Sequence, residues 1–261
     1  MTQPGARSRL RLLVSSIGLE VQPYKVVAVT LVGVDGCRVG WVCVFLVPDS
    51  TPDICVLPTP RSVLRRFPSP AVVAVDIPIG LTDEGRRSCD VEARLRLRAP
   101  RASSVFSPPI RPILDCQSRL DASERQRAID GRGFGAQGWG ILPKIREWDE
   151  TLRSALDRLS ELFEVHPEVC FCALNSEKPM AFSKRSEPGA TERRRLLEEA
   201  FGRQAVASVL TNPSRRLAKD DDVLDALVAL WTARRIARGE ARRLPEARET
   251  DSVGFPMAIW Y

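Results

Sequence analysis

Apolar runs separated by turn residues predict that the first part of the chain is rich in strands. Val26–Val34 is apolar and rich in β-branched residues, and a second run, Trp41–Val47, follows after a tight turn that contains glycine. Two such runs joined by a tight turn are typical of a β-hairpin. Further short strands are predicted at Ile54–Leu57 and at Ala71–Val75.

The later part of the chain has mainly helical periodicity. Asp220–Arg238 is the clearest helix, because it has an acidic first turn, an apolar stripe and arginines in its last turn. Other helices are predicted at 61–67, 122–130, 145–159 and 191–201, and a fifth strand is predicted to end near His166. A hairpin followed by alternating strands and helices predicts an α/β fold, with a mixed sheet and flanking helices.

The same pattern indicates a single domain over residues 26–261. Residues 1–25 are interpreted as a disordered N-terminal extension, and segment 83–140, rich in Arg, Ser, Pro and Gly, as an insertion into the domain. The 261 residues are 44% hydrophobic, which is enough apolar material for a sizeable core.

Charge, cysteine content and hydropathy limit the partners only loosely. The formal net charge of +6 permits nucleic-acid binding without requiring it. None of the seven cysteines has C-x-x-C spacing, so no zinc or redox motif is indicated, and a reducing cytoplasm is the expected compartment. No apolar run approaches the roughly 18–20 residues of a membrane-spanning helix, so no membrane partner is expected.

Aspartates stand where the predicted elements end or begin. Asp35 and Asp76 each follow a strand, and Asp222 and Asp225 share one face of the last long helix. If the two strands are parallel neighbours, their ends meet at one sheet edge, where open α/β sheets bind ligands. Each feature alone is a common turn or helix cap. Together they predict a cluster of carboxylates whose repulsion Mg²⁺ or Mn²⁺ would relieve.

Seven motifs in order resemble one known family over about Val27–Tyr261. They are G-V-D-G-C-R-V-G-W-V, A-V-D-I-P-I-G-L, R-S-C-D-V-E-A-R, S-S-V-F-S-P-P, P-K-I-R-E-W-D, E-V-H-P-E-V-C-F and D-D-V-L-D-A-L-V-A-L-W-T-A-R-R. The family is the one named domain of unknown function 429, described as predicted nucleases of RNase H-like fold. The resemblance therefore implies an RNase H-like mixed sheet and metal-dependent hydrolysis of DNA or RNA.

The last motif is also similar to the final helix of RuvC-type junction resolvases. By that similarity Asp35, Asp76, Asp222 and Asp225 would be catalytic metal ligands. Glu164, near the end of the predicted fifth strand, is expected at the same sheet edge as Asp76 and is a candidate secondary ligand. The resolvases carry a glutamate where this chain has Asp76. They work as dimers, which is compatible with a dimer here, although the sequence identifies no interface.

Other polar residues near the motifs have alternative interpretations. His166, the only histidine, is interpreted as a structural residue before a proline, with a proton shuttle as the alternative. Lys144 would hold a substrate phosphate or form an ion pair on a helix surface. Arg101, Arg111 and Ser104 lie in or beside an irregular loop, where they would contact a substrate phosphate or belong to a solvated basic face.

Two other classes of function stay open at this point. An ATP- or phosphate-binding protein of actin-like topology would also place an Asp-Gly turn after its first strand, but the sequence has no second convincing glycine-rich phosphate loop. A non-catalytic member of the fold that binds nucleic acid or protein is the other alternative. Loss of Mn²⁺ binding on removal of one aspartate would favour the metal enzyme over both.

Overall fold

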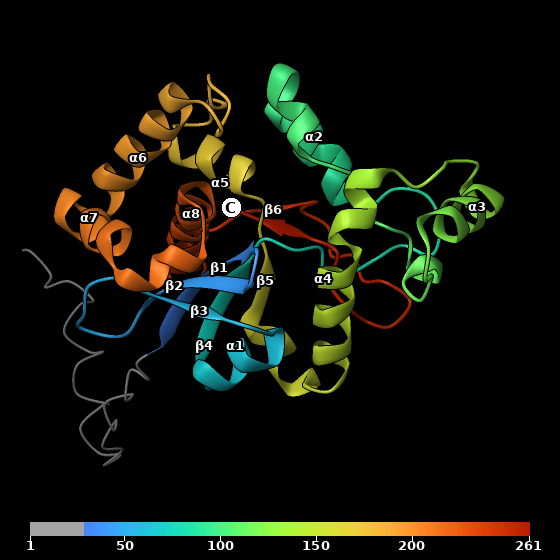
Figure 1. Cartoon of the computed structure of the whole chain (residues 1–261), viewed down its shortest axis with the longest axis horizontal. Helices are drawn as coiled ribbons and strands as arrows, with labels where there is room; N and C mark the ends of the chain where they lie inside the picture. Colours follow the sequence, from blue (N-terminus) through green and yellow to red (C-terminus); the bar gives the residue numbers. More distant parts are fainter. Residues whose placement is uncertain (1–28) are drawn as a thin grey trace, which may run out of the picture.

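A five-stranded sheet in the order β3-β2-β1-β4-β5 forms the centre of the computed structural model, which describes residues 29–261. The strands are β1 (Thr30–Cys37), β2 (Gly40–Leu46), β3 (Asp53–Leu57), β4 (Ala71–Val75) and β5 (Leu162–Glu164). β1, β4 and β5 are parallel, whereas β2 is antiparallel to β1 and β3. This mixed sheet with flanking helices confirms the predicted α/β class and is consistent with an RNase H-like fold (Figure 1).

Helices cover both faces of the sheet (Figure 1). They are α1 (Pro60–Arg66), α2 (Ser88–Arg101), α3 (Arg119–Asp130), α4 (Ala136–Arg153), α5 (Pro167–Leu174), α6 (Glu187–Phe201), α7 (Arg203–Thr211) and α8 (Asp220–Ala237), with 3₁₀ turns η1 (Ala102–Ser104), η2 (Arg111–Ile113), η3 (Leu156–Glu161) and η4 (Pro213–Leu217). A second sheet pairs β6 (Arg243–Leu244) with β7 (Ile259–Trp260), and Trp260 bridges Val165 just beyond β5. Within residues 29–261, no helix combines the length and apolar character that crossing a membrane requires.

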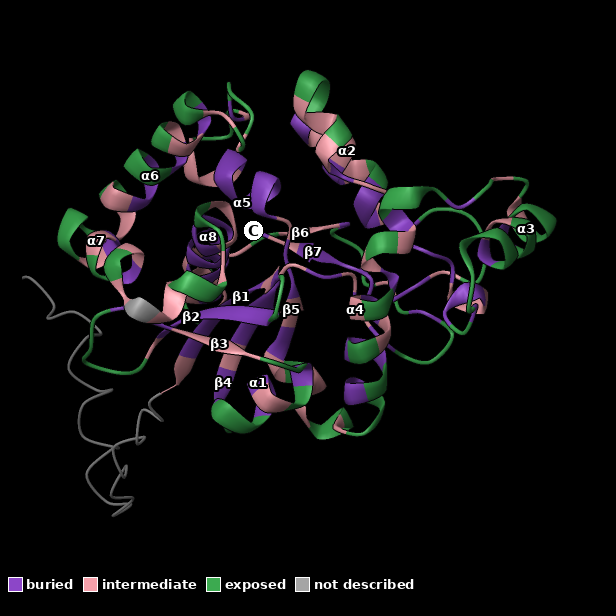
Figure 2. Cartoon of the chain, in the orientation of Figure 1, coloured by how far each residue is buried: buried purple, intermediate pink, exposed green. Residues whose placement is uncertain are grey.

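Alternation along the strands produces one core on each face of the sheet. Leu31 and Ala74 belong to the core that includes α2, α5 and α8, whereas Val32 and Val75 belong to the core that includes α1 and α4. Figure 2 shows the central strands and α8 largely buried, with exposed residues on the outer sides of α3, α6 and α7. Within each strand, neighbouring residues therefore point to opposite faces of the sheet, and residues two apart point to the same face.

Helix α8 packs directly on β1 because Gly33 has no side chain. A Cβ at Gly33 would lie 2.1 Å from the Ala226 carbonyl oxygen and 2.2 Å from the Leu230 nitrogen, so any side chain would push the helix away. Asp35 lies two residues further along β1 and so points to the same face, toward the start of α8. This close approach is what brings the end of β1 and the start of α8 together.

Several boundaries differ from the predicted ones. Asp35 lies within β1 rather than after it, because the hairpin ladder continues and pairs Asp35 with Val42. The helix predicted at 145–159 begins earlier, at Ala136, and ends at Arg153. Segment 83–140, predicted as an insertion, contains α2, η1, η2 and α3. The expected extension at 1–25 lies outside the described residues, as does the start of the strand predicted from Val26.

Candidate metal centre

Asp35 and Asp76 lie side by side on neighbouring parallel strands. The register pairs Gly33 of β1 with Ala74 of β4. The ladder continues past β4, where the Asp76 N–H donates to the Val34 carbonyl at 2.9 Å. Asp76 is therefore level with Asp35, and both side chains point to the face that α8 covers.

Two aspartates of α8 face these strand ends. Asp225 is only 1% exposed, and it is close enough to Asp35 for its charge to raise the pKa of that carboxyl. Asp222 is half-buried, and its Oδ2 accepts a hydrogen bond from the Lys219 N–H at 3.0 Å, which caps the helix. The structure thus gathers Asp35, Asp76 and Asp225 in one cluster, with Asp222 at its rim.

Lys184, which the sequence analysis did not single out, completes this cluster. It lies between α5 and α6, and its Nζ donates to the Asp225 Oδ2 at 2.5 Å. Its positive charge also lowers the pKa of Asp35 and Asp76, against the stronger effect of burial. A lysine ammonium is therefore built into the group of carboxylates.

A buried ion pair lies beside the aspartates. Glu168, in the first turn of α5, accepts a hydrogen bond of 2.5 Å from Arg193, and both side chains are almost fully buried. The charge of Glu168 raises the pKa of Asp76 and Asp225. Glu168 therefore adds to the negative potential of the cluster, although Arg193 offsets part of its charge.

Burial holds the carboxyl groups of the cluster above the usual pKa range. It raises the pKa of Asp76 and of Asp225 to about 6 in each case, with Lys184 acting in the opposite direction. It raises the pKa of Asp35 well above the ordinary value, helped by the charges of Asp76 and Asp225. Full ionisation of the cluster is therefore costly unless further positive charge is present.

These pKa values predict that the metal-free protein loses stability as the pH rises. An unfolded aspartate titrates near about pH 3.9, whereas Asp76 and Asp225 titrate near about 6 when folded. Between these values the folded state holds protons that the unfolded state has released, so the free energy of unfolding falls as pH increases through the window. We expect a loss of roughly a few kcal/mol between pH 4 and 7.

Chelator-treated protein unfolded with urea at several pH values would measure this loss. Burial lowers the pKa of His166, which makes stability rise with pH over part of the same range. Asp225→Asn retains His166, so the contribution of His166 cancels when the pH dependence of the variant is subtracted from that of wild type. An equal pH dependence in the two proteins would contradict the prediction for Asp225.

The aspartate cluster suits a hard divalent cation by the chemistry of its donors. Its oxygens are carboxylate oxygens, which Mg²⁺ and Mn²⁺ prefer. Within residues 29–261, only Cys89, Asp90 and Glu164 form a group of three whose ligand atoms all lie within 4.8 Å of one another, so no three of the aspartates do. Mg²⁺ is usually held by one or two carboxylates and several waters, so such an ion does not need three ligand atoms this close together.

Glu164, predicted as a secondary metal ligand, is engaged elsewhere. It pairs in register with Val75, one position before Asp76, and it lines the same small hollow as Asp76, Arg87 and Asp90. Its two oxygens accept hydrogen bonds from the Arg87 guanidinium at 2.6 and 2.8 Å. Arg87 also binds both oxygens of Asp90. The group of Cys89, Asp90 and Glu164 is thus an ion-paired cluster around an arginine.

His166 and the loop after α2 lie next to the aspartates. The His166 Nε2 is 3.3 Å from the carbonyl oxygen of Ser104, and its Nδ1 is buried without a partner among the described residues. Asp76, Phe106 and His166 line one small hollow. The loop that begins after Ser104 therefore runs beside Asp76, and η1 and Arg101, at the end of α2, precede it.

Lys144 and Arg111 have partners away from the aspartates. Lys144 lies on the α4 side of the sheet, where its Nζ donates to the Gly40 carbonyl at 2.7 Å. The guanidinium of Arg111 pairs with Asp149, at 2.7 Å, and with Asp251. Neither side chain contacts the carboxylate cluster, so the structure does not bring these two predicted phosphate contacts to it.

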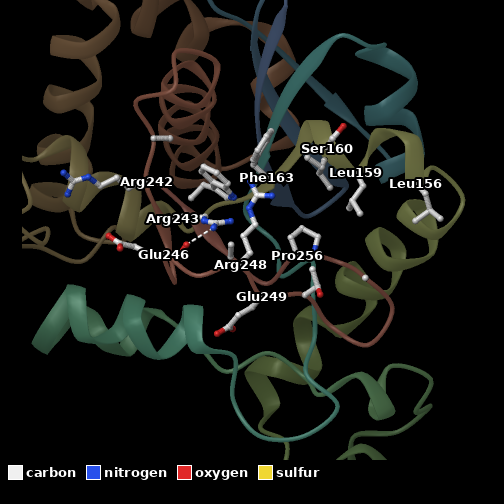
Figure 3. A pocket seen from close by; sticks show the side chains of 16 residues that line it. Leu156, Leu159, Ser160, Phe163, Arg242, Arg243, Glu246, Arg248, Glu249 and Pro256 are labelled. Carbon is white, nitrogen blue, oxygen red and sulfur yellow. Dashed lines mark hydrogen bonds between the residues drawn. The ribbon is translucent and has the colours of Figure 1, made fainter.

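A more open hollow of about 1130 Å³ lies along the outer edge of β5, beside β6 and β7. Figure 3 shows Arg242, Arg243 and Arg248 around it, with Phe163 at its wall. Its lining also contains two glutamates and none of the four aspartates. The hollow therefore combines charges of both signs and is separate from the carboxylate cluster.

A family model described as protein of unknown function (DUF429) matches residues 33–250. The chain belongs to this family. The match includes all four aspartates, Lys184 and the Glu168–Arg193 pair, so the whole candidate site lies within the family region. Comparisons with curated proteins and with solved structures gave no match.

Proposed function

We propose that this protein is a metal-dependent nuclease that hydrolyses phosphodiester bonds of DNA or RNA. Asp35, Asp76 and Asp225 would form the centre of the active site, with Asp222 at its rim, and the ion would be Mg²⁺ or Mn²⁺. Hydrolysis of a phosphodiester needs an activated water and neutralisation of the leaving oxygen, which a divalent ion held by carboxylates supplies. The natural partner would be nucleic acid, and the protein would act in the cytoplasm.

One observation carries this proposal. Two parallel strands place Asp35 and Asp76 level with each other, on the face where α8 brings Asp225. Carboxyl groups whose pKa is raised by burial and by neighbouring charges cost stability, so their concentration in one place favours a functional role over a structural one. The net charge of +6 is compatible with a polyanionic substrate.

The same geometry divides the predicted substrate-binding residues into those that lie near Asp76 and those that have partners elsewhere. Arg101 and Ser104 border the loop that runs beside Asp76, so Arg101 is the stronger candidate for holding a phosphate next to the site. Arg111 and Lys144 have other partners. His166 has a lowered pKa because it is buried, so it is neutral at pH 7 and would move a proton only through its unpartnered Nδ1.

A cleavage assay tests the proposal. We expect the wild-type protein to cleave at least one member of a panel of labelled single-stranded, double-stranded and branched DNA and RNA in Mn²⁺ or Mg²⁺, and a chelator to stop it. Asp76→Asn should reduce the rate by about 100-fold or more, since loss even of a residue that only supports a metal ligand costs about 10–100-fold.

The matched control is Asp157→Asn, which makes the same chemical change at an exposed aspartate outside the site. It should cleave at the wild-type rate. Absence of cleavage by folded wild-type protein that binds Mn²⁺, across the whole panel, would overturn the nuclease proposal. Equal activity of wild type and Asp76→Asn would show that any cleavage arises from a contaminant or another site.

A further inference from the structure

We propose that Lys184 replaces one of the two metal ions that a carboxylate cluster of this kind can hold, so that the site binds a single divalent cation. This inference rests on the proposed function, because it concerns the same site. In it, Asp35 and Asp76 bind the ion, whereas Asp225 is neutralised by the Lys184 ammonium. Lys184 is then a positioning residue that limits the number of ions and fixes where the ion lies.

The contact between Lys184 and Asp225 is short and well placed. The Nζ lies 2.5 Å from the Asp225 Oδ2, which is the distance of a charge-assisted hydrogen bond. Asp225 is only 1% exposed, so it has few alternative partners in solvent. A metal ion at Asp225 would have to displace this ammonium and separate a partly buried ion pair.

The chain fixes Lys184 in this place before any ligand arrives. The Ser186 hydroxyl donates to the Ser183 carbonyl at 2.8 Å and also caps the start of α6. A Cβ at Gly189 would lie 2.0 Å from the same carbonyl, so α6 packs tightly against the turn that holds the lysine. The buried Arg193 donates to the Phe182 carbonyl at 3.1 Å, next to this turn.

The charges of the cluster also favour one ion. The three buried aspartates, Asp35, Asp76 and Asp225, carry three negative charges when ionised, and Lys184 supplies one positive charge. Of the other carboxylates nearby, Glu168 is balanced by Arg193 and the half-buried Asp222 at the rim is open to solvent. One divalent ion then balances the remaining two, whereas a second would leave an excess of positive charge among buried groups, which is costly. Asp35 and Asp76 lie level on neighbouring parallel strands, which suits an ion held by two carboxylates and water.

Calorimetric titration of the full chain with Mn²⁺ tests this inference. We expect one ion per wild-type chain. Lys184→Met should bind two ions, or one ion about tenfold more tightly or better, because a positive charge beside the site has been removed. Lys184→Arg should behave like wild type. The matched control is Lys178→Met, which removes a charge from an exposed lysine on the same segment.

Lys184→Met leaves Asp225 without its partner and so risks poor folding. The double variant Lys184→Met with Asp225→Asn removes both charges and should fold, and we expect it to bind one Mn²⁺ with the affinity of wild type. Loss of binding in this double variant, two ions in wild type, or an unchanged titration of folded Lys184→Met would each overturn the role of Lys184. A wild-type chain that binds no Mn²⁺ would instead overturn the proposed function itself.

Discussion

Asp35→Asn is expected to abolish metal-dependent activity while making the metal-free protein more stable. Burial and the charges of Asp76 and Asp225 raise the pKa of Asp35, so its ionised form is disfavoured in the folded protein. Asparagine has nearly the same shape and no charge, so the substitution removes repulsion at pH 7.5. We expect an increase of about 4 °C in the melting temperature, in line with the trade-off between stability and function at such sites.

The same variant should lose the stabilisation that Mn²⁺ gives to wild type. A ligand that binds only the folded state raises the melting temperature with its concentration, so thermal unfolding with a chelator and with excess Mn²⁺ measures both effects. Asp115→Asn, at an exposed position, is the control and should match wild type in both conditions. A lower melting temperature of Asp35→Asn than of wild type without Mn²⁺ would contradict the prediction, because it would mean that the Asp35 side chain stabilises the folded metal-free protein.

The strand pattern was predictable because it depends on local sequence. The apolar runs and their aspartates predicted which strands end at the site, and the family resemblance is confirmed by the match over residues 33–250. The contacts that bring the aspartates together join segments that are far apart in the sequence. The parallel pairing of β1 with β4 and the packing of α8 against Gly33 are contacts between distant segments, which a single sequence does not reveal.

Lys184 illustrates why part of the site escaped prediction. It stands in a turn with no periodicity, and only its contact with Asp225 identifies it. One signal was available: the chain has only five lysines in its 39 basic residues, so each lysine in so arginine-rich a protein invites a specific explanation. Helix α5 was missed for a different reason, since Pro167–Leu174 is buried on nearly all sides and so lacks an amphipathic period.

Glu164 shows the limit of reasoning from strand ends alone. It does lie at the same sheet edge as Asp76, as the sequence suggested, because β5 pairs in parallel with β4. Its hydrogen-bond partner decides its role, because a guanidinium that binds both carboxylate oxygens competes directly with a metal ion. Glu164 pairs with Val75 and lines the same hollow as Asp76, but both of its oxygens accept hydrogen bonds from Arg87.

Arg87→Met is expected to destabilise the protein by about 5 kcal/mol, because it leaves two buried carboxylates without a counter-charge. Arg87 is 2% exposed and donates to both Asp90 and Glu164, with a further hydrogen bond of 3.0 Å to the Gly80 carbonyl. Urea unfolding at pH 7.5 measures the loss, and Arg86→Met, at the exposed neighbouring position, should stay within about 0.5 kcal/mol of wild type. Arg87→Met protein as stable as wild type would contradict the ion-paired interpretation and return Cys89, Asp90 and Glu164 to consideration as metal ligands.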